Sequence, residues 1–214
     1  MTKLIGITQR VSEIKVYSEK RDCLDQQWSL FFEKVGILPV SIPNLISSPS
    51  SFFDSLKLEG LILTGGNDLS FVENPSEISI ERDKIENNLL DLAKQKQFPV
   101  IGVCRGLQLM NTYLGGKLSK IDNHVSVSHP VNKLRNSDFI SRKKVNSYHK
   151  WAIHLSDLAE DLIPLAEAPD GSIESFRHKT LPWLAIMWHP ERNQPFVEED
   201  MSLFAKHFKT GVEF

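Results

Sequence analysis

The stretch that decides the fold is Pro99-Val-Ile-Gly-Val-Cys104-Arg-Gly-Leu-Gln108. Its first half is an apolar, β-branched run, which is typical of a strand buried in a sheet. A helical pattern follows over about 105–114, where a pair of glycines would end the helix. Cys104 is therefore expected at the carboxyl end of a strand and the amino end of a helix, the edge where open α/β sheets bind ligands.

Gly102 and Gly106 flank Cys104 at a distance of two residues on either side. Small residues at this spacing allow a strained strand-to-helix turn to project a nucleophile. A helix N-terminus beside an imidazolium lowers the pKa of a thiol to between about 3.5 and 7.5. A cysteine that only fills the core is the competing interpretation, but flanking glycines weaken both strand and helix. We predict that Cys104 is a nucleophile and that Cys23 is structural.

The rest of the chain alternates between predicted strands and helices. Buried strands are expected at 3–8, 37–42 and 61–64, helices at 24–35, 81–97 and about 201–208, and short strands within 162–188 around a hairpin turn at Asp170-Gly171. This order predicts an α/β fold with a mostly parallel central sheet, helices on both faces and a small antiparallel strand segment. No repeat interrupts the pattern, so we expect one domain over residues 1–214.

A cysteine nucleophile that attacks an amide needs N–H donors for the developing oxyanion, each of which contributes about 3 kcal/mol. The backbone amide of Arg105 directly follows the nucleophile. The turn Thr64-Gly-Gly-Asn-Asp68 follows another predicted strand, and Gly66 is the donor we expect there. An ordinary turn remains the competing interpretation of the Gly-Gly pair by itself.

Trp188-His-Pro-Glu191 follows an apolar run and supplies a base with its partner. Pro190 biases His189 toward extended backbone, in which side chains two residues apart point the same way. Glu191 can then hold one ring nitrogen of His189 while the other faces the thiol. We predict a Cys104, His189 and Glu191 triad, although His-Pro-Glu alone would also suit a surface turn.

The other histidines lack cysteine or acidic partners at metal-binding spacing in the sequence. They are His124, His129, His149, His154, His178 and His207. We therefore expect neither a metal site nor a cofactor.

The composition restricts the classes of partner. Lys and Arg total 25 against 27 Asp and Glu, a net charge of −2, so neither nucleic acid nor an anionic membrane is expected as the main partner. The apolar runs fall short of the roughly 18 residues of a membrane span. The sequence leads directly into a strand without a secretory apolar region, and two cysteines in unlike contexts do not suggest disulfides. We expect a cytoplasmic protein that acts on a small molecule.

At these residues the chain resembles the class I glutamine amidotransferases, in which a Cys, His, Glu triad hydrolyses a glutamine side-chain amide through a thioester. Val100–Gln108 looks like their nucleophile elbow, Thr64–Asp68 like their oxyanion strand, and His189–Glu191 like the rest of the triad. The resemblance spans nearly the whole chain. It implies the flavodoxin-like architecture of that family.

Within the family the chain is most similar to the γ-glutamyl hydrolase branch that includes γ-glutamyl-γ-aminobutyrate hydrolase. The similarity rests on Arg82-Asp-x-x-Glu86, Cys104-Arg-Gly106 and Val145-Asn-Ser-Tyr-His149. It implies hydrolysis of the γ-glutamyl amide of a small conjugate with release of glutamate. It also implies that the α-amino and α-carboxylate groups of the glutamyl moiety are held by Gln108, Asn146, Ser147, Tyr148 and His149.

Two departures from the branch concern the leaving-group pocket. Leu69-Ser70 stands where a proline is common, and Lys150 stands where a glutamine is common. The cations expected in or near the site are Arg10, Lys150, Arg177 and Arg192. These cations suit an anionic leaving group better than a polyamine. A member of the branch that serves capsular polysaccharide biosynthesis has a phosphate-bearing substrate of this kind. Solvated surface charge is an equally good interpretation of the four side chains.

Two other functions stay open at this point. One is a glutaminase subunit that supplies ammonia to a separate synthetase partner. The other is a non-catalytic sensor that binds a γ-glutamyl metabolite. The oligomeric state also stays open, and a homodimer is among the possibilities.

Overall fold

A computed structural model describes residues 2–134 and 142–214 of the chain. Its centre is an eight-stranded sheet in the order β4-β1-β5-β6-β14-β13-β12-β9. These strands are β4 (Ile37–Ile42), β1 (Lys3–Thr8), β5 (Leu61–Leu63), β6 (Val100–Val103), β14 (Trp183–Ile186), β13 (Ile173–His178), β12 (Leu162–Glu167) and β9 (Asn132–Lys133). The first five pair in parallel and the last three extend the sheet in antiparallel fashion. The predicted mostly parallel sheet is confirmed.

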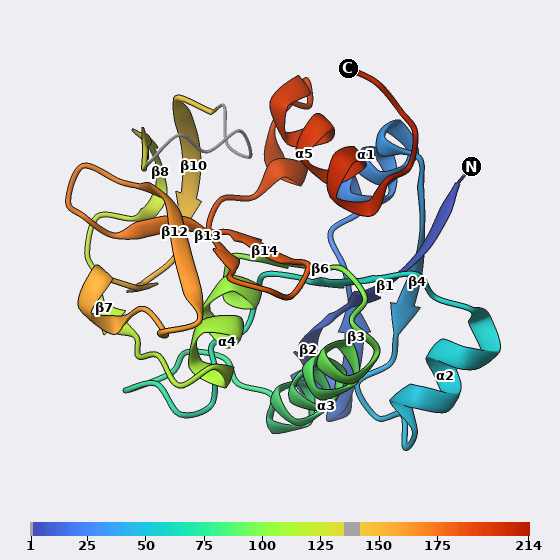
Figure 1. Cartoon of the computed structure of the whole chain (residues 1–214). Helices are drawn as coiled ribbons and strands as arrows, with labels where there is room; N and C mark the ends of the chain where they lie inside the picture. The colour runs from blue at the N-terminus through green and yellow to red at the C-terminus, as the bar shows by residue number, and fades with distance from the viewer. Residues whose placement is uncertain (1, 135–141) are drawn as a thin grey trace.

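Helices cover both faces of the parallel part, as predicted (Figure 1). They are α1 (Gln27–Val35), α2 (Pro49–Leu56), α3 (Ile80–Lys96), α4 (Arg105–Tyr113) and α5 (Glu198–Phe208), with short 3-10 turns η1 (Lys15–Tyr17), η2 (Leu155–Asp157) and η3 (Pro190–Arg192). On one face α1 packs against α5 through rings such as Phe31 and Phe204, whose centroids lie 5.0 Å apart. Within the described residues, no helix has the length and apolar character needed to cross a membrane.

The helix ends follow local chemistry. Gly36 ends α1 in the left-handed conformation at φ 72°, one residue past the helix predicted at 24–35. The Ser79 hydroxyl accepts the backbone N–H of Arg82 at 3.1 Å and caps the start of α3. Helix α2, which no apolar pattern had indicated, begins with the same type of cap at Ser48 followed by Pro49.

The expectation that the strand at 37–42 is buried on both faces is wrong. β4 is the edge strand and pairs only with β1 among the described strands. The side chain of Leu38 is 54% exposed as a result. By contrast, all three residues of β5 are buried, because β5 lies between β1 and β6.

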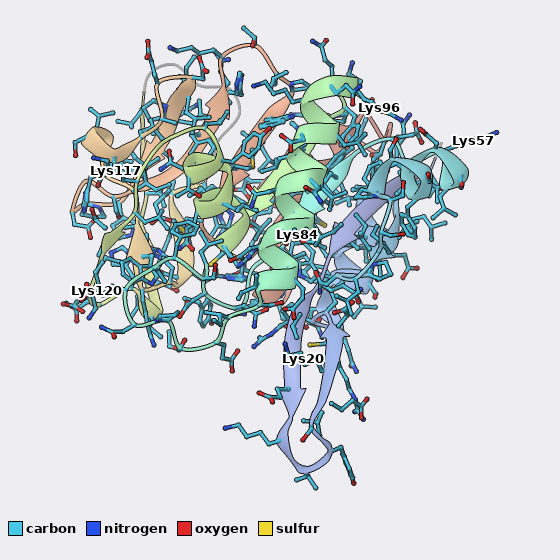
Figure 2. The ribbon with its side chains drawn as sticks, turned by 90° about the horizontal axis from the view of Figure 1, so that it is seen from below. Lys20, Lys57, Lys84, Lys96, Lys117 and Lys120 are labelled. Atoms are coloured by element: carbon cyan, nitrogen blue, oxygen red, sulfur yellow. The ribbon has the colours of Figure 1, made fainter. Side chains whose placement is uncertain are left out.

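Three small antiparallel ribbons border the main sheet. β2 (Arg10–Ile14) pairs with β3 (Glu19–Cys23), β8 (Val125–Pro130) with β10 (Lys144–Tyr148), and β7 (Ser119–Lys120) with β11 (Trp151–Ala152). Figure 2 shows the β2-β3 hairpin projecting from the body of the protein, with Lys20 on one of its strands. No sequence pattern indicated this hairpin, which places Arg10 and Cys23 beside the carboxyl edge of the sheet.

Candidate active site

Cys104 occupies the turn between β6 and α4 and has the left-handed backbone angle φ 52°. A non-glycine residue held at an unfavourable backbone angle costs about 1–3 kcal/mol and is typical of functional turns. The flanking glycines are required by close packing. A Cβ atom added to Gly106 would lie 2.3 Å from the carbonyl oxygen of Leu63, and one added to Gly102 would lie 2.8 Å from that of Gly106. The sharp turn inferred from the sequence is therefore present.

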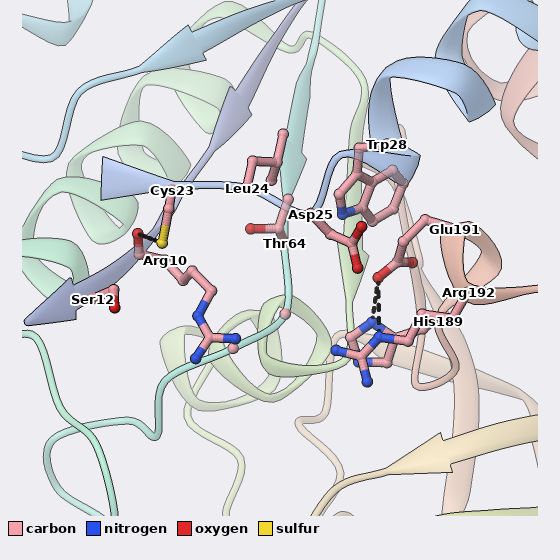
Figure 3. A pocket seen from close by; sticks show the side chains of 12 residues that line it. Arg10, Ser12, Cys23, Leu24, Asp25, Trp28, Thr64, His189, Glu191 and Arg192 are labelled. Carbon is pink, nitrogen blue, oxygen red and sulfur yellow. Dashed lines mark hydrogen bonds and ion pairs between the residues drawn. The ribbon is translucent and has the colours of Figure 1, made fainter. Parts of the chain in front are cut away.

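His189 follows β14 with extended backbone, as its position before Pro190 predicted. Its Nδ1–H donates to Glu191 Oε1 at 2.6 Å, and both side chains are buried (Figure 3). The local geometry differs from the predicted extended pair, because η3 wraps Glu191 back toward the ring in a 3-10 turn. The contact was foreseen, but its backbone route was not.

Gly65 brings the nucleophile and the imidazole together. A Cβ atom added at this glycine would lie 3.1 Å from His189 Nε2 and 3.4 Å from the Cβ of Cys104. The same added atom would lie 2.5 Å from His189 Cε1, so no larger residue fits here without displacing the ring. The sequence indicated a role for the neighbouring Gly66 only. A Gly-Gly pair by itself does not reveal that the Gly65 position must lack a side chain so that His189 can lie beside Cys104.

The electrostatics of the site favour a thiolate and imidazolium pair. Burial alone would raise the pKa of Cys104, but the charge of His189 and its hydrogen bond to sulfur lower that pKa below its ordinary value. Burial alone would lower the pKa of His189, whereas the Cys104 thiolate and the Glu191 carboxylate raise it to about 9. Each charge stabilises the other.

The turn after β5 presents one candidate oxyanion donor. The guanidinium of Arg82 donates to the carbonyl oxygens of Thr64 at 2.7 Å and Gly65 at 3.2 Å, and also to that of Gly66. The Gly66 N–H belongs to the same peptide unit as the Gly65 carbonyl, and in a trans peptide these two groups point in opposite directions. Since the Gly65 carbonyl faces Arg82, the Gly66 N–H points away from Arg82. The second candidate, the Arg105 amide, is the first of α4 and has no acceptor within its own helix.

A buried ion-pair network holds these two turns together. The side chain of Arg105 pairs with Asp83 and Glu86, and Arg82 Nε donates to Glu86 at 2.9 Å. Arg82, Glu86 and Arg105 are almost completely buried. The Arg82-Asp-x-x-Glu86 pattern thus joins α3 to both the nucleophile turn and the candidate oxyanion turn.

Two cavities meet at His189. The Cys104 cavity, of about 260 Å³, contains Cys104 itself, and the hairpin cavity, of about 270 Å³, lies toward β3 and α1 (Figure 3). Both are lined by Arg10, Gly66, His189 and Arg192. The hairpin cavity also contains Cys23, the thiol interpreted from the sequence as structural. A ligand seated over Cys104 would therefore have space to extend past His189 into the hairpin cavity.

Five of the predicted binding residues line the Cys104 cavity: Gln108, Tyr148, His149, Arg10 and Lys150. The amide of Gln108 donates to the Trp151 carbonyl at 2.9 Å. Arg192 lies over the Tyr148 ring at 4.3 Å, a cation–π contact that fixes both side chains at the rim. Arg177 lines neither cavity and donates to the carbonyl oxygen of His178.

Asn146 and Ser147 also line neither of these two cavities. The Asn146 amide instead accepts the backbone N–H of His189 at 2.8 Å and donates to its carbonyl at 2.8 Å. Ser147 Oγ donates to the His124 carbonyl at 2.7 Å. In this geometry Asn146 can position His189 but does not reach a ligand in either cavity. The residues next to Asn146 in the sequence could not reveal this contact.

A family profile described as Peptidase C26 matches residues 3–191. The chain belongs to the Peptidase C26 family. This family is class I glutamine amidotransferase-like, as the residue patterns indicated, and membership makes the protein a hydrolase of that type.

The chain is similar to two curated proteins over most of its length. It is 37% identical over 193 residues to a γ-glutamyl-CDP-amidate hydrolase of Campylobacter jejuni, covering 88% of this chain and 90% of that protein. It is 32% identical over 198 residues to protein NtpR of Enterococcus hirae, covering 78% and 80% of the two chains.

A solved structure described as a glutamine amidotransferase of Thermotoga maritima has a similar fold. The TM-score is 0.63 at 16% identity, with 98% of this chain and 85% of that chain covered. At this identity the likeness shows the fold alone.

Proposed function

We propose that this protein hydrolyses the γ-glutamyl amide bond of a small conjugate with an anionic, phosphate-bearing leaving group. The observation that carries the proposal is the arrangement of Cys104 and the His189–Glu191 pair beside cavities rimmed by cations. The similarity to a γ-glutamyl-CDP-amidate hydrolase supports the same substrate class. A place in capsular polysaccharide biosynthesis is part of this proposal.

In the proposed mechanism the Cys104 thiolate attacks the γ-carbonyl carbon. The carbonyl oxygen takes the negative charge and accepts N–H bonds from Gly66 and Arg105. The tetrahedral intermediate collapses as His189 Nε2 gives its proton to the leaving nitrogen. Water then attacks the thioester, His189 takes a proton from it, and glutamate leaves with the thiolate restored.

We place the glutamyl group in the Cys104 cavity, where Gln108 and Lys150 lie within reach of its polar end. The leaving group would pass over His189 toward the hairpin cavity. Arg10 and Arg192 line both cavities and so lie on that route. Their guanidinium groups can bind phosphate in bidentate fashion, with each charged contact contributing about 1.5–3 kcal/mol.

The test measures glutamate release from γ-glutamyl-CDP-amidate, from the neutral γ-glutamyl-p-nitroanilide and from glutamine. The proposal predicts a kcat/KM for the nucleotide conjugate at least about 10-fold above that for the neutral conjugate, as one charged contact requires. Equal values would remove the anionic leaving group from the proposal. Glutamine hydrolysis that needs an added synthetase would instead identify a glutaminase subunit.

A sensor without catalysis is separated by thiol reactivity. The proposal predicts that Cys104 reacts with iodoacetamide faster than a free thiol at pH 7, because its pKa is lowered. Slow alkylation together with no glutamate release would support the sensor.

A further inference from the structure

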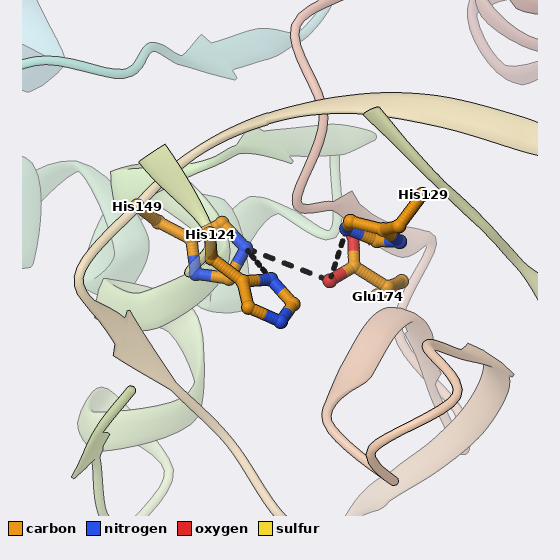
Figure 4. A group of neighbouring side chains, drawn as sticks. All are labelled: His124, His129, His149 and Glu174. Atoms are coloured by element: carbon orange, nitrogen blue, oxygen red, sulfur yellow. Dashed lines mark hydrogen bonds and ion pairs between the residues drawn. The ribbon is translucent and has the colours of Figure 1, made fainter. Parts of the chain in front are cut away.

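Four side chains from separate segments meet outside the triad. They are His124, before β8; His129, on β8; His149, after β10; and Glu174, on β13 (Figure 4). Each offers one ligand atom, and these four atoms lie within 4.8 Å of one another. His124, His149 and Glu174 are buried, and His129 is largely covered. The sequence spacing gave no sign of this cluster, because its members come from three separate parts of the chain.

The outer nitrogen of each histidine already has an acceptor. His124 Nε2 lies 2.8 Å from Asp170, His129 Nδ1 lies 3.0 Å from the Pro130 carbonyl, and His149 Nδ1 lies 3.0 Å from the Trp151 carbonyl. When the outer nitrogens carry these protons, the inner nitrogens present lone pairs to the centre of the cluster. Such outer partners for ring N–H groups are the usual support of metal-binding histidines.

The inner Nε2 of His129 has no hydrogen-bond partner among the described residues, and Glu174 is the other unsatisfied member of the cluster. It is fully buried, and neither of its carboxylate oxygens has a hydrogen-bond partner among the residues that the structure describes. Its Oε1 lies 3.5 Å from His149 Nε2 and 3.7 Å from His129 Nε2, which are long for hydrogen bonds. A carboxylate buried among three lone pairs requires a cation.

The spacing fits a small divalent ion. Tetrahedral zinc with ligand bonds of about 2.0–2.1 Å separates its ligand atoms by about 3.3 Å. The inner nitrogens of His124 and His149 lie 3.3 Å apart, and the distances to Glu174 are only slightly longer. Ser147 Oγ, also 3.3 Å from His124 Nδ1, gives its proton to a backbone carbonyl at 2.7 Å and so leaves that lone pair free.

We propose that His124, His129, His149 and Glu174 form a zinc site that clamps the β8-β10 ribbon to β13 of the main sheet. Three imidazoles and one carboxylate are a borderline donor set that zinc prefers. β10 also carries Asn146, which holds the backbone of His189, and His149 lines the Cys104 cavity. The ion would fix one wall of the active site without contacting substrate.

A proton is the competing occupant of this cluster. Burial lowers the pKa of His149, but Glu174 and the Cys104 thiolate outweigh that effect and raise the pKa above its ordinary value. A single imidazolium would satisfy one contact of Glu174 and leave the other two histidines facing it. Metal binding predicts one Zn²⁺ per chain, whereas protonation predicts no bound Zn²⁺. A zinc titration therefore separates the two.

The experiment titrates Zn²⁺ alone into the full chain after chelator dialysis, with a chromophoric chelator as competitor and Tm as a second readout. The proposal predicts one Zn²⁺ per chain with a raised Tm. His129→Ala is the main variant, because His129 is the most exposed ligand, and Zn²⁺ affinity should fall by at least about 100-fold. Glu174→Gln should do the same, with far-UV circular dichroism as the check on folding.

Two controls exclude other zinc ligands. His154→Ala removes a histidine outside the cluster and should bind like the wild type. Cys104→Ser removes the thiol beside His189 and should also retain one Zn²⁺. The proposal is overturned if the wild type binds no Zn²⁺ at one per chain, or if His129→Ala binds as well as the wild type.

Discussion

The parallel side of the molecule, from β4 to β14, and its antiparallel side, which comprises β13 and the bordering β8-β10 ribbon, carry their polar groups in different ways. On the parallel side, each candidate catalytic group follows a strand within a short contiguous motif, as Cys104 follows β6 and His189 follows β14. On the antiparallel side, the histidine cluster and Asn146 act through contacts between segments far apart in sequence. The polar groups of the parallel side can therefore be predicted from local sequence patterns, whereas those of the antiparallel side can be recognised only from tertiary contacts.

The largest expected effect falls on the parallel side and contrasts the two cysteines. Cys104→Ala should lower kcat by at least about 10⁴-fold, because the proposed covalent route is lost. Cys23→Ala is the matched control and should stay within a few-fold of the wild type, although Cys23 lines the hairpin cavity. Steady-state glutamate release measures both. Near wild-type turnover by a folded Cys104→Ala variant would refute the nucleophile assignment.

The next effect concerns Glu191. Glu191→Gln should lower kcat by about 10³-fold, because the carboxylate that orients His189 and stabilises its positive charge is lost.

In the wild type, activity should rise with pH through the lowered pKa of Cys104 and fall near pH 9, where His189 loses its proton. The variant should lose activity at a lower pH, since Glu191 raises the pKa of His189. An unchanged alkaline limb would contradict this, and Glu198→Gln, at the exposed start of α5, is the control.

Asn146 tests the contact that joins the two sides. Asn146→Ala should lower kcat by about 10²-fold with little change in KM, because the variant misplaces His189 without removing a substrate contact. Gln108→Ala should act mainly on KM, since Gln108 lines the Cys104 cavity. Measuring kcat and KM separately decides the matter. A KM effect at Asn146 would restore the substrate-binding role that the resemblance implied.

The smallest effect is expected at the rim. Arg10→Ala should raise KM for γ-glutamyl-CDP-amidate by about 10-fold and leave the neutral anilide nearly unchanged. Arg192→Ala should affect both substrates, because Arg192 Nε lies 3.6 Å from Glu191 Oε1 and its charge helps to lower the pKa of Cys104. Arg177→Ala is the matched control, because Arg177 lines neither cavity. Equal losses on both substrates for Arg10→Ala would show that Arg10 acts on the glutamyl part or on folding.

The sequence predicted the sheet, its covering helices and the positions of Cys104, His189 and Glu191, because strand–turn–helix patterns and Gly or Pro signals are local. It did not predict the β2-β3 hairpin, whose residues are largely polar and exposed and so carry little core pattern. It did not identify β4 as an edge strand, because strand order depends on long-range pairing. The direction in which Asn146 points likewise depends on a partner 43 residues away.

The most direct test of the central claim is detection of the acyl-enzyme. Wild-type protein mixed with γ-glutamyl-CDP-amidate is quenched in acid within the first turnovers and digested for mass spectrometry. We predict a glutamyl adduct on the peptide that contains Cys104 and none on the peptide that contains Cys23. Glutamate released over the same turnovers without any adduct, together with retained activity of Cys104→Ala, would contradict the account.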